Sequence, residues 1–136
     1  MEKRTILFVD DEEKVLKSLD RGLRDEPYSC LFTTSCTEAL EILEQNEVHV
    51  IVTDIRMSEM SGLKLLTVVK EKYPHIVRLV LSGYTQVGDL MKAVNYREVF
   101  KFIMKPWKLE EDLKPILREA VEYYSFRNER DRLAVK

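Results

Sequence analysis

The sequence predicts an α/β fold with a doubly wound parallel sheet, formed by a single domain. Its 136 residues are enough for one hydrophobic core but too few for two domains of ordinary size. Five short apolar runs of strand length alternate with longer stretches whose apolar residues are spaced as in helices. The first and third runs are almost continuously apolar, which indicates strands buried on both faces of a parallel sheet covered by helices.

Five strands are predicted from runs rich in β-branched and aromatic residues. In chain order they read TILFV, CLFTT, VHVIVT, IVRLVLS and VFKFIM, at residues 5–9, 30–34, 48–53, 76–82 and 99–104. Right-handed crossover connections leave few topologies for five such strands. The flavodoxin-like order 2-1-3-4-5 is common at this size and is the order we expect.

Five helices are predicted from apolar residues three or four positions apart. In chain order these residues are Val15, Leu16, Leu19 and Leu23; Ala39, Leu40 and Leu43; Leu63, Leu66 and Val69; Leu90, Ala93 and Val94; and Leu113, Ile116, Leu117, Ala120, Val121 and Tyr124. The pattern weakens after Tyr124, because residues 125–132 are almost wholly polar. We therefore expect a domain at residues 1–124, and at residues 125–136 an exposed helical extension or frayed linker toward an output domain beyond Lys136.

The charge balance excludes several classes of partner. The chain has 22 Lys and Arg against 24 Asp and Glu, a net charge of −2, so we expect no direct contact with nucleic acid.

No apolar stretch approaches the roughly 18 residues of a membrane span, and the N-terminus lacks the pattern of a signal peptide. We expect a cytoplasmic protein with no membrane partner. Cys30 and Cys36 are expected to be reduced, with a regulatory disulfide between them as the alternative.

Polar side chains follow the predicted strands at one edge of the sheet. Ligands of an open parallel sheet bind beyond the carboxyl ends of the strands, near the point where strand order reverses. Asp10 and Asp11 follow the first predicted strand, and Asp54 follows the third. Ser82 is the last residue of the fourth predicted strand, and Lys105 follows the fifth. These five residues are therefore the candidate site.

Three carboxylates gathered at one edge would repel one another unless a positive charge lay among them. Mg²⁺ prefers oxygen ligands and usually takes one or two carboxylates while keeping several waters. We expect Asp11 and Asp54 to bind Mg²⁺, or another divalent cation, directly and Asp10 to bind it through water. Lys105 would supply the remaining positive charge.

Four motifs at these strand ends resemble the receiver domain of two-component response regulators, the CheY-like family. They are VDDEE after the first strand, TDIRMSEMSGL around Asp54, LSGY at the end of the fourth strand and KFIMKPW at the fifth. The resemblance covers about residues 4–124. It implies that Asp54 accepts a phosphoryl group from a phosphohistidine on a sensor histidine kinase or phosphotransfer protein.

The resemblance also implies a role for each neighbouring residue. Mg²⁺ would bind Asp11, Asp54 and the backbone carbonyl of Arg56, with Asp10 acting through water. Phosphoryl transfer of this kind needs in-line positioning and neutralised oxygens more than covalent help from the protein. The chain would then be a signalling phosphoacceptor rather than an enzyme.

Switching residues are implied in the same way. Lys105 would pair with the phosphoryl oxygens, Ser82 would donate its hydroxyl to them, and Phe102 would occupy the aromatic switch position. The Lys105–Pro106 bond would be cis. The output would be a change in the surface of the fourth helix, fifth strand and fifth helix, with a homodimer formed on phosphorylation as one outcome.

Some positions depart from the usual pattern of the family. Ser58 stands where proline is usual, Ser82 where threonine is commoner, and Phe102 where tyrosine is frequent. Arg56 and Tyr84 are bulky residues two positions beyond Asp54 and Ser82, and we expect them to hinder water and slow self-dephosphorylation. Separately, Trp107 is expected to anchor the start of the fifth helix by packing.

Two other functions are alternatives to the signalling switch. A phosphatase of the haloacid dehalogenase type also uses an aspartate nucleophile and Mg²⁺, but it resembles this chain less because it needs an acid where Arg56 stands. A flavodoxin would need a phosphate-binding loop after the first strand, where Asp10, Asp11, Glu12 and Glu13 would repel the phosphate of a flavin nucleotide. The phosphoacceptor hypothesis is therefore favoured.

Overall fold

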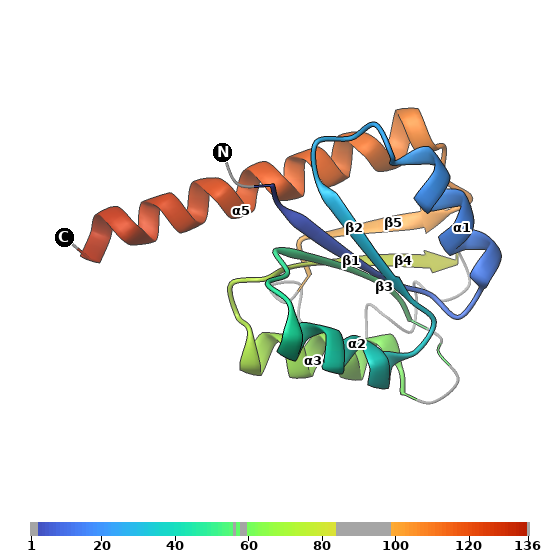
Figure 1. Ribbon diagram of the computed structural model, residues 1–136, viewed down its shortest axis with the longest axis horizontal. Coiled ribbons are helices and arrows are strands. Elements are labelled where there is room, and N and C mark those ends of the chain that lie inside the picture. Colours follow the sequence, from blue (N-terminus) through green and yellow to red (C-terminus); the bar gives the residue numbers. More distant parts are fainter. Residues whose placement is uncertain (1–2, 56, 58–59, 84–98, 136) are drawn as a thin grey trace.

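The protein is a three-layered α/β structure with one sheet between two layers of helices (Figure 1). The computed structural model describes residues 3–55, 57, 60–83 and 99–135, with the backbone alone described at 82–83 and 128–135.

The sheet contains five parallel strands, as the sequence predicts. They are β1 (Thr5–Val9), β2 (Ser29–Thr33), β3 (Val50–Asp54), β4 (Val77–Gly83) and β5 (Lys101–Lys105). Their order in the sheet is β2-β1-β3-β4-β5, and each neighbouring pair is parallel. The predicted fold class and strand order are confirmed.

Four α-helices and one π-helical turn are described. They are α1 (Glu13–Gly22), α2 (Cys36–Gln45), α3 (Gly62–Lys72), the turn η3 (Leu109–Leu113) and α5 (Lys114–Val135). Two helices have serine N-caps, because Ser35 accepts a hydrogen bond from the Glu38 N–H at 3.2 Å and Ser61 accepts one from the Lys64 N–H at 3.1 Å. The predicted helix containing Leu90, Ala93 and Val94 lies outside the described residues.

The two faces of the sheet bury separate hydrophobic cores. Because side chains alternate along a strand, Ile6 and Phe8 of β1 point to one core and Leu7 and Val9 to the other. The first core lies under α1 and α5, and the second lies under α2 and α3 (Figure 1). Strands β1 and β3 are buried on both faces, as their continuous apolar sequences predict.

Strand ends differ from the predicted ones by one or two residues. Val48 and Val99, both predicted to lie in strands, are buried in the segments just before β3 and β5. Burial of an apolar side chain does not require its backbone to join the ladder, so composition alone places such boundaries loosely. At the other end, β3 includes Asp54 as its last residue.

The two cysteines lie in different layers. Cys30 packs against the core under α1 and α5, whereas Cys36 belongs to the core under α2 and α3. A disulfide between them would have to join side chains that pack into cores on opposite faces of the sheet.

Helix α5 continues past the sheet to Val135 (Figure 1). Tyr124 is 6% exposed. Among the residues of this helix whose side chains are described, it is the last one buried in the core. The polar segment that follows continues this helix to Val135. Within the described residues, no helix combines the length and the apolar character needed to cross a bilayer.

Candidate phosphorylation and metal site

Three carboxylates meet at the carboxyl edge of the sheet. Asp10 and Asp11 directly follow β1, and Asp54 ends β3, which is the neighbour of β1 in the sheet. One carboxylate oxygen from each of the three lies within 4.8 Å of the others. Asp10 and Asp54 are buried, whereas Asp11 is exposed. The cluster is therefore partly buried and is accessible to solvent at Asp11.

Lys105 reaches this cluster from the end of β5. Its Nζ lies 2.9 Å from Asp54 Oδ2 and 3.4 Å from Asp10 Oδ2. The side chain is 24% exposed, so the ammonium is held against two buried carboxylates without being sealed from water. The structure therefore brings together four of the predicted site residues, namely Asp10, Asp11, Asp54 and Lys105.

Backbone groups fix the second oxygen of each buried carboxylate. The Glu12 N–H donates to Asp10 Oδ1 at 2.9 Å, and the Ile55 N–H donates to Asp54 Oδ1 at 2.7 Å. In both residues Oδ2 faces Lys105. Each carboxylate is thus oriented before any ligand arrives, which is the preorganisation that a transfer site needs.

The site carries more negative charge than its lysine can balance. Burial raises the pKa of the Asp10 carboxyl above its ordinary value, against the opposing effects of the Glu12 N–H and the Lys105 ammonium. Burial also lowers the pKa of Lys105, but the hydrogen bond to Asp54 and the charge of Asp10 outweigh it and raise that pKa. Three carboxylates facing one ammonium leave a formal charge of −2 for a divalent cation to neutralise. An all-oxygen donor set suits a hard ion such as Mg²⁺.

A glycine holds the start of α3 against the end of β3. The Gly62 N–H donates to the carbonyl of Ile55 at 2.8 Å, and a Cβ at Gly62 would overlap the carbonyl oxygen of Asp54. This close approach holds the first residue of α3 against the backbone of the candidate phosphoacceptor.

Other predicted residues are placed only in part. The backbone of Ser82 lies in β4 opposite Met104, one residue beyond Leu81, which pairs with Asp54. Its side chain is not among those described. Arg56, Ser58 and Tyr84 lie outside the described residues altogether.

The segment around Lys105 contains the two predicted aromatic residues. Phe102 is half-buried and packs against the core under α2 and α3. Trp107 packs against the other core, which agrees with its expected anchoring role. The peptide bond between Lys105 and Pro106 is cis, as the resemblance implies.

Sequence reasoning missed a second contact of Trp107. Lys105 Nζ lies over its ring, 5.9 Å from the ring centroid. The available signal was the spacing, since only Pro106 separates the two residues in the chain.

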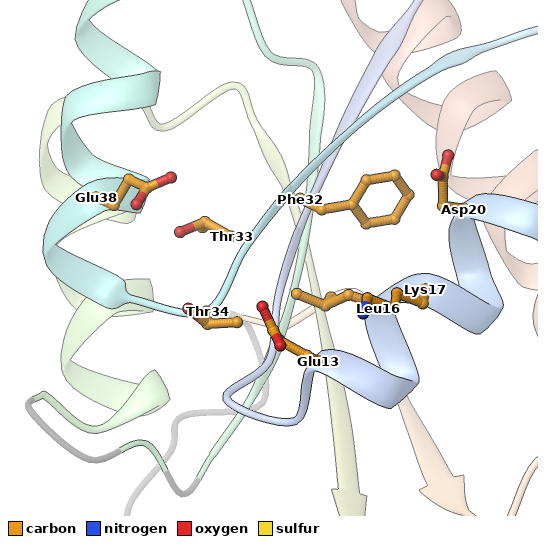
Figure 2. Close-up of a pocket in the computed structure, with 8 residues that line it drawn as sticks. All are labelled: Glu13, Leu16, Lys17, Asp20, Phe32, Thr33, Thr34 and Glu38. Carbon is orange, nitrogen blue, oxygen red and sulfur yellow. The ribbon is translucent and has the colours of Figure 1, made fainter.

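Residues of α1 line two hollows in the described part of the chain. A groove of about 430 Å³ lies between α1 and the segment from Lys105 to Leu109, and Lys105 itself lines it. A second hollow of about 290 Å³ lies between α1, the end of β2 and α2, with Glu38 on the α2 side and Asp20 on the α1 side (Figure 2). The residues that the structure places around this second hollow do not include the three clustered carboxylates.

The chain is similar in sequence to known regulatory proteins. The chain matches the response regulator receiver domain over residues 6–117. It is 38% identical to the hydrogenase transcriptional regulatory protein HoxA of Cupriavidus necator over 129 residues, which is 95% of this chain and 26% of that protein. It is 31% identical over 125 residues to the DNA-binding transcriptional regulator NtrC of Proteus hauseri, covering 90% of this chain and again 26% of the relative. The chain thus spans about a quarter of the length of these relatives.

A solved structure agrees with these matches. The signal receiver domain of an HD domain-containing protein from Pseudomonas fluorescens Pf-5 superposes with a TM-score of 0.84 at 31% identity, covering 91% of this chain and 98% of that one. Such receiver domains are signalling modules rather than enzymes. The chain belongs to the family of response regulator receiver domains.

Proposed function

We propose that Asp54 accepts a phosphoryl group from the phosphohistidine of a sensor histidine kinase or phosphotransfer protein, and that this modification switches the surface of the domain. The observation that carries the proposal is the position of Asp54. Its Oδ2 lies 2.9 Å from Lys105 Nζ, and its carboxylate lies within 4.8 Å of those of Asp10 and Asp11.

The transfer needs a nucleophilic oxygen in line with the phosphorus and cations on the transferred oxygens. An Asp54 carboxylate oxygen forms the new bond to phosphorus while the bond from phosphorus to the histidine nitrogen breaks, and the electron pair leaves on that nitrogen. The Ile55 N–H keeps the carboxylate oriented. The Lys105 ammonium is close enough to move from the carboxylate to the phosphoryl oxygens as charge builds up there.

Asp11 and Asp54, together with the backbone carbonyl of Arg56, would hold Mg²⁺ or another divalent cation, with Asp10 acting through water. The ion would neutralise the phosphoryl oxygens and the carboxylates. Asp11 suits direct binding because it is the exposed member of the cluster.

The switch that we propose runs from Ser82 and Phe102 to the surface formed by β5, α5 and the fourth helix that the sequence predicts. Ser82 would donate its hydroxyl to the phosphoryl group, and Phe102 would change its packing in response. Met104 on β5 and Tyr123 on α5 are large apolar residues left 42% and 40% exposed. They are suited to a surface that gains a partner, including a second copy of this chain, on phosphorylation.

The cellular location and the domain organisation of the protein are also proposals. We place the protein in the cytoplasm, where it would meet its phosphodonor, with a receiver domain at residues 1–124 and with residues 125–136 leading toward an output domain. HoxA and NtrC are named as transcriptional regulators. By analogy, the effect of phosphorylation would pass along α5 to a regulatory output domain. The receiver domain itself would make no contacts with DNA.

Incubation with acetyl phosphate and Mg²⁺, followed by intact mass measurement, tests the proposal. We expect the native chain to gain the mass of one phosphoryl group, and we expect no gain when a chelator removes Mg²⁺ or in Asp54→Asn. An equal gain in Asp54→Asn would contradict the assignment.

A further inference from the structure

We propose that Trp107 is a positioning residue for phosphoryl uptake, because its ring keeps the ammonium of Lys105 at Asp54. This inference rests on the proposed function and adds to it a residue from outside the carboxylate cluster. The ammonium that lies 2.9 Å from Asp54 Oδ2 also lies over the indole, 5.9 Å from the ring centroid. That separation is within the range at which a cation is attracted to the face of an aromatic ring, and tryptophan is the most effective such ring.

Lys105 needs a second restraint. Its side chain is flexible, carries a compact charge and remains 24% exposed, so water competes with the carboxylates for it. The attraction to Asp54 also changes during the reaction, since phosphorylation converts that carboxylate into an acyl phosphate. The attraction to the indole does not depend on the chemical state of Asp54, because it arises from the face of the ring.

Trp107 is itself held in place. The residue is half-buried and packs against the core under α1 and α5. It also lines the groove that Lys105 and the α1 residues Val15 and Leu19 line. A ring packed against this core can restrain a lysine two residues away, because Pro106 is the only residue between them.

A double-mutant cycle on phosphorylation by acetyl phosphate tests the inference. We expect Trp107→Leu, which keeps an apolar side chain but removes the ring, to slow phosphorylation about fivefold. Trp107→Phe keeps an aromatic face and is expected to restore most of the native rate. In a Lys105→Ala background, Trp107→Leu is expected to have no further effect. Phe126→Leu, which changes an aromatic residue 66% exposed on α5, is the matched control and is expected to match the native rate.

A spectroscopic measurement separates the contact from the reaction. The Cε protons of Lys105, assigned by their loss in Lys105→Ala, are expected to be shifted upfield by the ring current in the native chain and to lose that shift in Trp107→Leu. Both proteins are compared without acetyl phosphate, so the result does not depend on phosphorylation.

The outcomes distinguish the two proposals. A native rate in Trp107→Leu, an equal slowing in the Lys105→Ala background, or an absent ring-current shift would overturn the role of Trp107 and leave the proposed function standing. A native chain that takes up no phosphoryl group would overturn the proposed function, and the role of Trp107 in uptake with it, even where the ring-current shift is present.

Discussion

Lys105 Nζ lies 2.9 Å from Asp54 Oδ2, although the two residues are 51 positions apart in the chain and belong to strands that β4 separates. This contact is made at the edge where β1, β3, β4 and β5 all end. Each residue comes from the end of its own strand. The chemistry of the site is therefore a consequence of the parallel sheet, and changes that disturb the strand ends should disturb the chemistry.

Asp11 offers a test of the metal site that spares the fold. Because Asp11 is exposed, Asp11→Asn should fold normally while losing direct binding of Mg²⁺. A ligand that binds only the folded state at ten times its Kd stabilises it by about 1.4 kcal/mol. We expect Mg²⁺ to raise the Tm of the native chain in this way and to have a much smaller effect on Asp11→Asn at the same concentration. Equal Mg²⁺ dependence in the two proteins would show that Asp11 is not a ligand.

Gly62 should be intolerant of any side chain. Gly62→Ala places a Cβ against the carbonyl oxygen of Asp54, and backbone cannot move aside as a side chain can. We expect a loss of roughly 2 kcal/mol of unfolding free energy, measured by denaturant titration, together with slower phosphorylation.

Gly22→Ala is the matched control for this change. Its Cβ would meet the end of the flexible Leu109 side chain, which can rotate away, and Gly22 lies in a helix that alanine favours. Similar losses in the two variants would mean that the close approach of Gly62 to β3 does not limit stability.

The buried Glu26 gives the protein a pH-dependent element outside the site. Arg118 of α5 donates two hydrogen bonds of 2.9 Å to its carboxylate, and this pairing lowers the pKa of Glu26 below its usual 4.5. A lowered carboxyl pKa stabilises the folded state above the ordinary pKa, and that stabilisation is lost as the pH falls through the lower folded value.

We therefore expect Glu26→Gln to be less stable than the native chain at pH 7, with the difference shrinking below pH about 4.5. Urea titrations of both proteins across this range measure the difference. A gap that stays constant down to low pH would mean that ionisation of Glu26 does not stabilise the fold.

Much of the architecture could be predicted because it depends on periodic burial. The continuous apolar sequences of β1 and β3 predict a parallel sheet, and such a sheet brings Asp10, Asp54 and Lys105 to one edge. Membership of the receiver family also excludes the phosphatase and flavodoxin alternatives.

Buried polar residues outside the site could not be predicted in the same way, because their burial depends on partners far along the chain. His49 is 3% exposed. It accepts a hydrogen bond from the Thr5 N–H at 2.9 Å and packs edge-on against Tyr124. Glu26 and Arg118 are 92 residues apart. No local pattern marks such pairs, whereas strand and helix periodicity is local.

The lifetime of the phosphorylated state should depend on Arg56 and Tyr84. The sequence places these bulky residues two positions beyond Asp54 and Ser82, where they are expected to obstruct water that attacks phosphorus in line. Replacing both with alanine should shorten the half-life of phosphorylated protein severalfold, as measured by the loss of the phosphorylated mass after removal of acetyl phosphate. Unchanged decay would contradict this role.

The identity of the phosphorylated residue tests the central claim most directly. Reduction of an aspartyl phosphate with borohydride converts that aspartate into homoserine, which peptide mass spectrometry can locate. After treatment with acetyl phosphate and Mg²⁺, we expect homoserine at position 54, between Thr53 and Ile55, and no conversion at Asp10 or Asp11. Homoserine at either of those positions, with Asp54 unmodified, would contradict the account.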